Sequence, residues 1–528
     1  MKKLKFGLSI LAVLALAACG ASDNVDEVGE PGYVAENNGT DDSDDEVAVA
    51  DLRMLTVANA AFPQTMDPTA TNEVHSSLIN TQIYETLVTR DVDMNIIPSL
   101  ATEWTRIDEY TMEFTLRQGV TFHDGSPFNA EAVKFSLQRS VATPQAAAVQ
   151  NFMDPDGFEV VDEYTIRISS LEPFAPMLAF LGHNTAFIVS QEAVLEHGDD
   201  FAFNPSGTGP FQLESVATGD NIVLVRNENY HGELPQIAGI TFRVIPEPAS
   251  RLIGLETGDF DIAMDVAPSD AARIENEANL KLLQRVNNTV RYVGMNTERA
   301  PFDDVRVRQA VNYAINTELL IEAVLEGFGE PAFGPMARNL PFASHDVLPY
   351  GFDLERAAVL LEEAGLADGF SANLIVGTQI NENLAVVIQN MLGEINIDVT
   401  IERVEPGTLL ETTNGGDFDM FILGFNPGTG DPHNMLNPMF HSDNIGSAGN
   451  RPRLNNPEVD LLIDRARAEF DDAARADIYR EVQELIRDLA PWAFLDAGVT
   501  LHATRDNVRG YTIRLNGQQT FAGVYFVE

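Results

Sequence analysis

A single cysteine, Cys19, stands in this chain of 528 residues, so no disulfide can form within the chain. A long chain without covalent cross-links must be held together by the packing of its own core. At roughly 150 residues per domain, residues 52–528 are enough for about three units or for two large lobes. The sequence therefore predicts a large protein whose stability comes from burial of apolar side chains.

The position of Cys19 indicates a role outside the core. Three lysines among the first five residues precede an apolar stretch, 6–18, which has the charge and length of a signal peptide and is shorter than the ~20 residues of a spanning helix. The sequence Leu-Ala-Ala-Cys at 16–19 resembles a bacterial lipobox, in which the chain is cut before the cysteine and lipid is attached to it. We expect a signal peptide over 1–18 and a lipidated, membrane-anchoring Cys19; the alternative is a signal peptide with an incidental cysteine.

Acidic residues dominate the next segment and the chain as a whole. Residues 22–51 hold eleven Asp or Glu and no Lys or Arg, which predicts a disordered, self-repelling tether over 19–51. The whole chain has 33 basic and 80 acidic residues and a net charge of −47. Such a charge repels nucleic acid and anionic lipid surfaces, so we expect no nucleic-acid partner and interpret the charge as an aid to solubility.

Strand and helix patterns alternate beyond Leu52. The stretches 107–116 and 161–171 resemble each other and predict two strands of one small sheet. Helix starts are indicated by Asn129, Asp304 and Asp353, each a capping residue before an amphipathic stretch. Apolar runs between the helices are typical of strands. The fold class predicted is α/β with parallel pairing.

Motifs for catalysis are absent from the sequence. It has no Gly-Lys dipeptide for a phosphate-binding loop, no G-x-S-x-G and no H-E-x-x-H. We therefore expect no enzyme activity, no cofactor and no metal, with a hydrolase as the disfavoured alternative. One loop carries Asp431, His433, His441 and Asp443, which are ligand types for a transition metal. The plainer interpretation is a binding loop with ordinary polar groups.

A family resemblance is carried by stretches spread from Leu52 to the C-terminus. They include PSLATEW (98–104), FTLRQGVTFHDGSPFNAEAVKFSLQR (114–139), GTGPFQL (207–213), NENYHG (227–232), LETGDFDIA (255–263), MNTERAPFDDVRVRQAVNYAIN (295–316) and GDFDMFILGF (416–425), followed by 456–492. Together they resemble the peptide/nickel-type solute-binding proteins of ABC transporters, bacterial extracellular solute-binding family 5.

The resemblance implies a two-lobed periplasmic-binding-protein-like fold. Two α/β lobes would be joined by hinge strands, with an extra small domain inserted in the first lobe, and hinge motion would enclose a ligand between them. Mapped onto this chain, the first lobe comprises 52–90, 205–290 and 490–528. The inserted domain comprises 91–204, and the second lobe comprises 291–489.

The same resemblance implies a function. The protein would be the monomeric, extracytoplasmic solute-binding component of an ABC importer, anchored by lipid and delivering oligopeptides to permease subunits. Its location would be the outer face of the cell membrane, or the periplasm where two membranes exist. The alternatives are an oligosaccharide ligand, a nickel chelate, or a signalling or adhesion lipoprotein that has kept the binding fold.

The predicted ligand site consists of two loops that face each other. The residues are Thr69, Thr71, Asn72, Glu73 and His75 from the first lobe, and Phe425, Asn426, Gly428, Thr429, Asp431 and His433 from the second. Relatives that bind dipeptides hold the ligand amine with an aspartate, whose place is taken here by Gly428, and hold its carboxylate with an arginine, which the matching segment 375–382 lacks. Backbone pairing with longer peptides needs few particular side chains.

The charged residues of these loops indicate which end of a peptide ligand the protein binds through charge. Asp431 or Glu73 is predicted to replace the missing amine anchor, and no basic residue other than His75 or His433 is predicted for a carboxylate. We therefore expect peptides longer than two residues, with blocked C-termini tolerated better than blocked N-termini.

Overall fold

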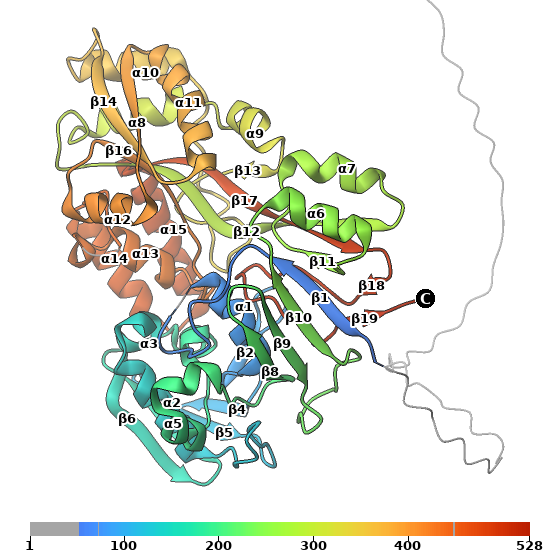
Figure 1. The fold of residues 1–528 in the computed structure, drawn as a ribbon. Coiled ribbons are helices and arrows are strands. Elements are labelled where there is room, and N and C mark those ends of the chain that lie inside the picture. The colour runs from blue at the N-terminus through green and yellow to red at the C-terminus, as the bar shows by residue number, and fades with distance from the viewer. Residues whose placement is uncertain (1–51, 72, 447–448) are drawn as a thin grey trace, which may run out of the picture. The chain divides into compact units, whose positions relative to one another are not determined.

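The computed structural model describes residues 52–71, 73–446 and 449–528 (Figure 1). The predictions for the signal peptide, for Cys19, for the tether and for Asn72 lie outside these residues. Within the described ranges, no helix combines the length and the apolar character that are needed to cross a bilayer.

An eleven-stranded mixed sheet runs through the body. Ten of its strands follow one path, in the order β15 (Ile397–Arg403), β14 (Phe370–Val376), β16 (Met420–Phe425), β12 (Leu280–Met295), β17 (Trp492–Arg505), β11 (Ile262–Ala263), β1 (Met54–Asn59), β10 (Gly239–Val244), β9 (Asn221–Arg226) and β8 (Phe211–Ala217), while β13 (Gly329–Pro331) pairs with β17. Pairing is parallel for β1 with β10 and β11 and for β14 with β15 and β16. The expected parallel pairing therefore holds within each half, whereas the hairpin pairs β8–β9 and β9–β10 and the pairs of β12 and β17 with each other and with β16 and β11 are antiparallel.

Two long strands join the halves of this sheet. β12 and β17 pair antiparallel from Leu280 opposite Arg505 to Gly294 opposite Trp492, with an irregularity between Val286 and Val290. On one side β17 pairs with β11, and on the other side β12 pairs with β16. The red β17 crosses between the two halves in Figure 1. These strands are the connections that a two-lobed fold requires.

Helices cover each half of the sheet. The half with β1 carries α1 (Val74–Ile83), α6 (Pro248–Thr257) and α7 (Ala271–Asn276). The half with β14 carries α8 (Val305–Ala314), α9 (Thr317–Leu325), α10 (Leu354–Glu363), α11 (Gln379–Gly393), α12 (Pro406–Gly415), α13 (His433–Phe440), α14 (Pro457–Ala468) and α15 (Asp472–Leu489). The predicted caps are confirmed, because Asp304 accepts from the amide of Arg306 and Asp353 from that of Arg356.

A separate four-stranded antiparallel sheet lies within 91–204. Its order is β4 (Ala101–Arg106), β5 (Thr111–Leu116), β7 (Thr165–Ser170) and β6 (Met153–Asp162). The two similar stretches of the sequence form β5 and β7, which pair directly, and this confirms that they share one sheet. The sheet packs with α2 (Ala130–Val141), capped by Asn129, and with the shorter α3 (Ala147–Gln150), α4 (Met177–Leu181) and α5 (Gln191–His197) around a core of its own.

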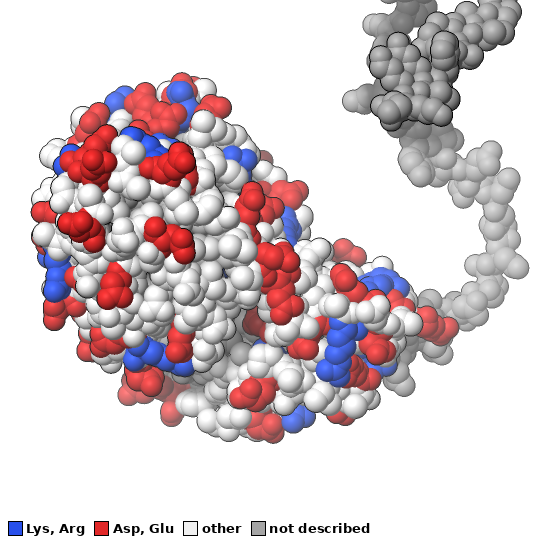
Figure 2. Space-filling model, turned by 90° about the horizontal axis from the view of Figure 1, so that it is seen from above, with Lys and Arg blue, Asp and Glu red and all other residues white. Residues whose placement is uncertain are grey.

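Four short strands complete the described part of the chain. β2 (Val88–Arg90) pairs with β3 (Ile96–Pro98), and β18 (Val508–Arg509) pairs with β19 (Tyr525–Phe526). Acidic side chains are spread over the face shown in Figure 2, with fewer basic ones between them. On this face the acidic charge is therefore spread out rather than gathered in one patch, as a solubilising charge would be.

Candidate ligand-binding site

A cavity of about 590 Å³ lies where the loop after β16 meets α1 and the segment 183–185. We call it the amide-lined cavity, because eight carboxamide side chains line it: Gln145, Asn151, Asn184, Asn426, Asn434, Asn444, Asn516 and Gln518. Its other walls include Phe425 and His183, and no Asp, Glu, Lys or Arg is among its lining residues. Each carboxamide can both donate and accept hydrogen bonds, so this wall suits a neutral, polar ligand surface.

A second cavity of about 170 Å³ adjoins the first. The two share Val74, Asn426 and Gly517 as wall residues. The smaller one is also lined by Asp265, Arg514, His75 and His502, and we call it the charged cavity. Asn287 of β12 and Thr500 of β17 belong to its wall, so it lies against the strands that cross between the lobes.

One residue in the wall of each cavity has a buried carboxamide oxygen without a hydrogen-bond partner. The side chain of Asn184 donates to Ser77, and its Oδ1 is buried without a partner. Asn59, in the charged cavity, donates to the carbonyl of Ala61 at 2.7 Å, and its Oδ1 is likewise buried without a partner. A buried acceptor without a partner is unfavourable, so a ligand that brings N–H or O–H donors gains affinity there.

Gly428 lies against His183 across the amide-lined cavity. A Cβ atom placed on Gly428 would lie 2.9 Å from Nε2 of His183. Nδ1 of His183 lies 2.9 Å from the hydroxyl of Thr185, and burial, with the charge of Arg90, lowers the pKa of the imidazole to about 3. His183 is therefore neutral, and an aspartate at position 428 would require the ring of His183 to shift.

Asp431, which the sequence analysis predicts as an anchor for the ligand amine, already forms an ion pair within the protein. Its carboxylate accepts from Nη2 of Arg475 at 2.8 and 2.9 Å, and both side chains are almost fully buried. The hydroxyl of Tyr479 lies 3.4 Å from the same carboxylate. This charge is already neutralised, and Asp431 lines neither of the two cavities.

His433 is buried in a contact between α13 and the domain that contains the four-stranded sheet. Its ring centre lies 5.1, 5.7 and 6.2 Å from those of Phe152, Phe174 and Phe180. Burial holds the pKa of His433 well below its usual value, so the imidazole is neutral. It lines a small cavity of about 110 Å³ with Phe152 and Phe180, which adjoins the amide-lined cavity through Asn151, Asn434, Pro438 and Asn444.

A backbone contact and an ion pair continue this interface. The amide of Ala175 donates to the carbonyl of Arg467 on α14 at 2.8 Å, and Arg467 also forms an ion pair with Glu172. The guanidinium of Arg106 stacks on Phe470 at 4.2 Å. The structure therefore brings α14 and the residues that follow it into direct contact with the domain that contains the four-stranded sheet.

The predicted first-lobe residues divide into structural and cavity-lining ones. Thr69 binds Asp67, which forms an ion pair with Arg139, and the hydroxyl of Thr71 accepts from the amide of Glu73 at 3.0 Å. Glu73 caps α1 by accepting from the amides of His75 and Ser76, both at 2.8 Å. Only His75 of this group lines one of the two cavities, and the prediction of Glu73 as an amine anchor is not supported.

The second loop contributes Phe425, Asn426 and Gly428 to the cavity walls. Thr429 is fully buried, and its hydroxyl accepts from the amide of Asp431 at 3.2 Å, so its role is to shape the loop. Among the predicted residues that the structure describes, four therefore line the two cavities: His75, Phe425, Asn426 and Gly428.

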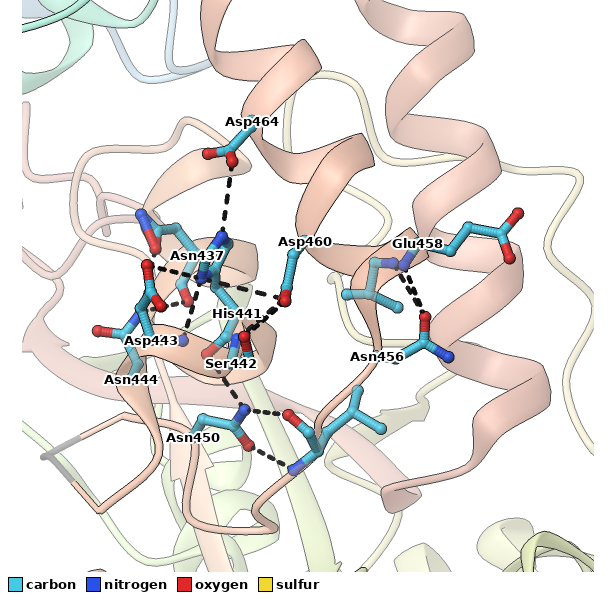
Figure 3. A network of polar contacts seen from close by, with 12 residues as sticks. Asn437, His441, Ser442, Asp443, Asn444, Asn450, Asn456, Glu458, Asp460 and Asp464 are labelled. Carbon is cyan, nitrogen blue, oxygen red and sulfur yellow. Dashed lines mark hydrogen bonds and ion pairs between the residues drawn. The ribbon is translucent and has the colours of Figure 1, made fainter.

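The residues around His441, considered above as a possible metal site, hold the end of α13 against α14. In the parts of the chain that the structure describes, no group of three or more His, Cys, Asp or Glu is arranged to hold a metal. His441 lies 3.7–3.9 Å from carboxylate oxygens of Asp443, Asp460 and Asp464, and Ser442 donates to Asp460 (Figure 3). These contacts tie the end of α13 to α14 and so fix the helix that supplies Asn434, Pro438 and Met439 to the cavity.

Two charged residues of the site were missed by the sequence analysis. Arg514 lines the charged cavity, although no basic residue other than histidine was expected near the ligand. Asp265 lines it as well, with a left-handed backbone at φ 50°. Neither belongs to a loop that the resemblance pointed to, and no local pattern distinguishes them from the many other charged residues.

Comparison with known proteins places this geometry in a family. The family model for bacterial extracellular solute-binding proteins, family 5, middle region, matches residues 95–447. The glutathione-binding protein GsiB of Salmonella typhi is 31% identical over 462 residues, covering 85% of this chain and 90% of that protein. The probable D,D-dipeptide-binding periplasmic protein DdpA of Escherichia coli is 29% identical and covers 89% and 93%.

Solved structures agree in fold. The periplasmic binding protein DppA of Helicobacter pylori, in complex with the peptide STSA, superposes with a TM-score of 0.78 at 28% identity and covers 90% of this chain and 98% of that one. NikA of Brucella suis, in complex with Fe(III)-EDTA, gives a TM-score of 0.82 at 25% identity and covers 90% and 100%. The chain belongs to family 5 of the bacterial extracellular solute-binding proteins, which serve ABC importers outside the cytoplasm and are not enzymes.

Proposed function

We propose that this family 5 solute-binding protein captures short oligopeptides between its lobes and delivers them to the permease of an ABC importer. We further propose that it acts as a monomer held at the outer face of the membrane by lipid on Cys19. The lobe boundaries given by the sequence, with 91–204 as the inserted domain, are part of the same proposal.

The amide-lined cavity is the observation that supports a peptide ligand. A peptide offers an N–H donor and a C=O acceptor at each residue, and carboxamides can match both without a charge. The volume of about 590 Å³ falls within the roughly 300–1,000 Å³ that is usual for ligand pockets. Phe425 adds an apolar surface that does not require a particular side chain.

Three of the four similar proteins named above have a short peptide as the ligand in their names, and NikA, with Fe(III)-EDTA, does not. Glutathione and the peptide STSA are both small peptides, and DdpA is named for D,D-dipeptides. Because an aspartate at position 428 would require the ring of His183 to shift, we propose that this chain does not use the dipeptide anchor of some relatives.

Native mass spectrometry of the purified protein tests the proposal. A co-purified ligand would report its own mass, and we expect masses of peptides. Calorimetric titration with a library of peptides two to six residues long should then give saturable binding, and a maltooligosaccharide series of similar mass should give none. Binding of the sugars without any peptide would contradict the proposal.

The anchor needs a separate test. Cys19→Ser should release the protein from the membrane fraction and leave its affinity for a bound peptide unchanged. Ser22→Ala, close in the sequence and outside the lipobox, is the matched control and should stay with the membrane. A membrane-bound Cys19→Ser variant would show that the lipid is not the anchor.

A further inference from the structure

We propose that the charged cavity binds an α-amino-acid head group of the ligand, with its ammonium at Asp265 and its carboxylate at Arg514. The inference rests on the proposed peptide-binding function and narrows its substrate class. The favoured ligands are peptides or conjugates that carry the ammonium and the carboxylate on one carbon atom, as a γ-linked glutamyl residue does.

Asp265 is held in a conformation that directs it to the cavity. Its backbone φ of 50° is in the left-handed region, which is unfavourable for a residue other than glycine. The surrounding structure maintains it, because Nη2 of the buried Arg251 donates to the carbonyl of Asp265 at 2.8 Å. The side chain of Asp265 keeps 56% of its surface exposed while it lines the cavity. Its charge is therefore available to a ligand, unlike that of Asp431.

Arg514 is the opposite charge in the same cavity. Its Nη1 donates to the carbonyl of Arg90 at 3.0 Å, and its Nε is buried without a hydrogen-bond partner. In the described part of the chain, no carboxylate oxygen lies within 4.0 Å of this guanidinium. Burial lowers the pKa of Arg514, and the charge of Asp91 opposes this shift only in part. A ligand carboxylate would supply the missing partner.

The remaining polar groups of the cavity suit an ammonium beside Asp265. Asn59, a buried carboxamide whose Oδ1 has no hydrogen-bond partner, is a neutral polar residue of the same wall. Nε2 of His502 lies 3.5 Å from Asp265, and its Nδ1 lies 2.7 Å from the hydroxyl of Tyr511, which holds the ring in place. His75 is the other histidine of the wall. An ammonium with three donors can therefore find a charge partner and a neutral acceptor here.

The volume of the charged cavity favours a single head group, with its ammonium and carboxylate on one carbon, over the two separate ends of a peptide. About 170 Å³ is small for a whole peptide, and the cavity adjoins the amide-lined one through Val74, Asn426 and Gly517. A head group can sit in the smaller space while the rest of the ligand extends into the larger one. A peptide that brought only its amino terminus would leave the cation of Arg514 without a counter-charge, which is costly for a partly buried group.

Two isomeric tripeptides test this directly. γ-Glutamyl-alanyl-glycine and α-glutamyl-alanyl-glycine have the same mass, composition and formal charge, and differ in whether the first ammonium and a carboxylate share one carbon. Calorimetric titration of the purified protein should show the γ isomer binding at least tenfold more tightly. Equal affinity, tighter binding of the α isomer, or no binding of either one would overturn the inference.

Protein variants then assign the charges. Arg514→Gln should remove most of the preference for the γ isomer, whereas Arg514→Lys should keep part of it. Asp265→Asn should weaken both isomers about tenfold or more, because both carry the ammonium. The exposed ion pair on α15 supplies matched controls, and Asp477→Asn and Arg480→Gln should leave both affinities unchanged. A full preference in a folded Arg514→Gln variant, checked by its thermal unfolding, would contradict the assignment.

Failure of this inference can be distinguished from failure of the proposed function. If ordinary α-linked peptides from the library bind and the γ isomer gains nothing, peptide binding stands and the head-group site is wrong. If no peptide of either linkage binds, the proposed function and the inference both fail.

Discussion

The two adjoining cavities differ in how they treat charge. The amide-lined cavity has no charged residue among its lining residues, and the one acid in the loop beside it, Asp431, is paired with Arg475. The charged cavity presents Asp265 and Arg514, and the structure pairs neither of them with a direct opposite charge other than a histidine. Proximity to the ligand does not make an acid an anchor, because the partner of the carboxylate decides its role.

The two cavities therefore contribute differently to ligand recognition. Neutral carboxamides can bind peptide groups of any sequence, which gives breadth. A pair of separated opposite charges recognises an arrangement of charges on the ligand, which gives selection.

Removing the charge of Asp431 should reduce stability rather than specificity. Asp431→Asn leaves the guanidinium of Arg475 buried without its anion, and breaking a buried ion pair in this way costs roughly 3–5 kcal/mol of unfolding free energy. Thermal unfolding should therefore occur several degrees lower, while the folded fraction keeps its peptide preferences. Asp477→Asn, at an exposed position on α15, is the control and should change neither quantity. A stable variant with altered peptide preference would restore Asp431 as an anchor.

Lowering the pH should reduce the stability of the fold, because two buried histidines, His183 and His433, are neutral in it. Burial depresses the pKa of His183 and of His433 in the folded protein, so the unfolded chain binds more protons below its own pKa of about 6.5. The stability that each imidazole contributes is fully present above that pH and is lost as pH falls from about 6.5 toward the folded pKa, which is about 3 for His183.

At pH 5 the loss should be about 2 kcal/mol for His183, and His433 should lose stability in the same direction. Unfolding midpoints measured between pH 7 and 5 should fall, and His433→Leu should fall less than the wild type over the same range. His345→Gln, at an exposed position, should keep the wild-type slope. Equal slopes in all three proteins would rule out a neutral His433 as the cause.

An aspartate at position 428 should lower the affinity for peptides, because its side chain would contact His183 too closely. In Gly428→Asp the new Cβ would lie 2.9 Å from His183, and overpacking of this kind costs roughly 1–3 kcal/mol. Peptide affinity should drop about 5- to 150-fold in calorimetry. The double variant with His183→Ala should recover most of the loss, because the contact is gone. A single variant with wild-type affinity would show that the two groups do not approach each other in the bound state.

Single carboxamides should each contribute little. Asn426→Ala removes one hydrogen-bonding group from the amide-lined cavity, and a neutral hydrogen bond contributes about 0.5–1.5 kcal/mol. We expect peptide affinity to fall about two- to thirteenfold, similarly for peptides of different sequence. Asn276→Ala on the surface is the control. A loss confined to one peptide sequence would mean that this carboxamide recognises a side chain instead of the backbone.

Much of the fold could be predicted because it depends on local patterns. Asn129, Asp304 and Asp353 begin helices as capping residues do, and the similar stretches at 107–116 and 161–171 became neighbouring strands. The site could be predicted only in part. Phe425, Asn426 and Gly428 were found through a family motif, whereas Asp265 and Arg514 are 249 positions apart and meet only through the fold. Asp431 was misassigned because its partner, Arg475, lies on a distant helix.

The approach of Gly428 to His183 also restricts the order in which this binding site can change during evolution. A lineage that acquired an aspartate at position 428 first would pass through a poorly closing intermediate, since the imidazole occupies the space that the new side chain needs. Shrinkage of position 183 would have to come earlier, and it would bring no benefit of its own. A conversion to dipeptide recognition therefore needs an ordered pair of changes at positions 183 and 428, besides the arginine that segment 375–382 lacks, whereas the carboxamides of the wall can change one at a time.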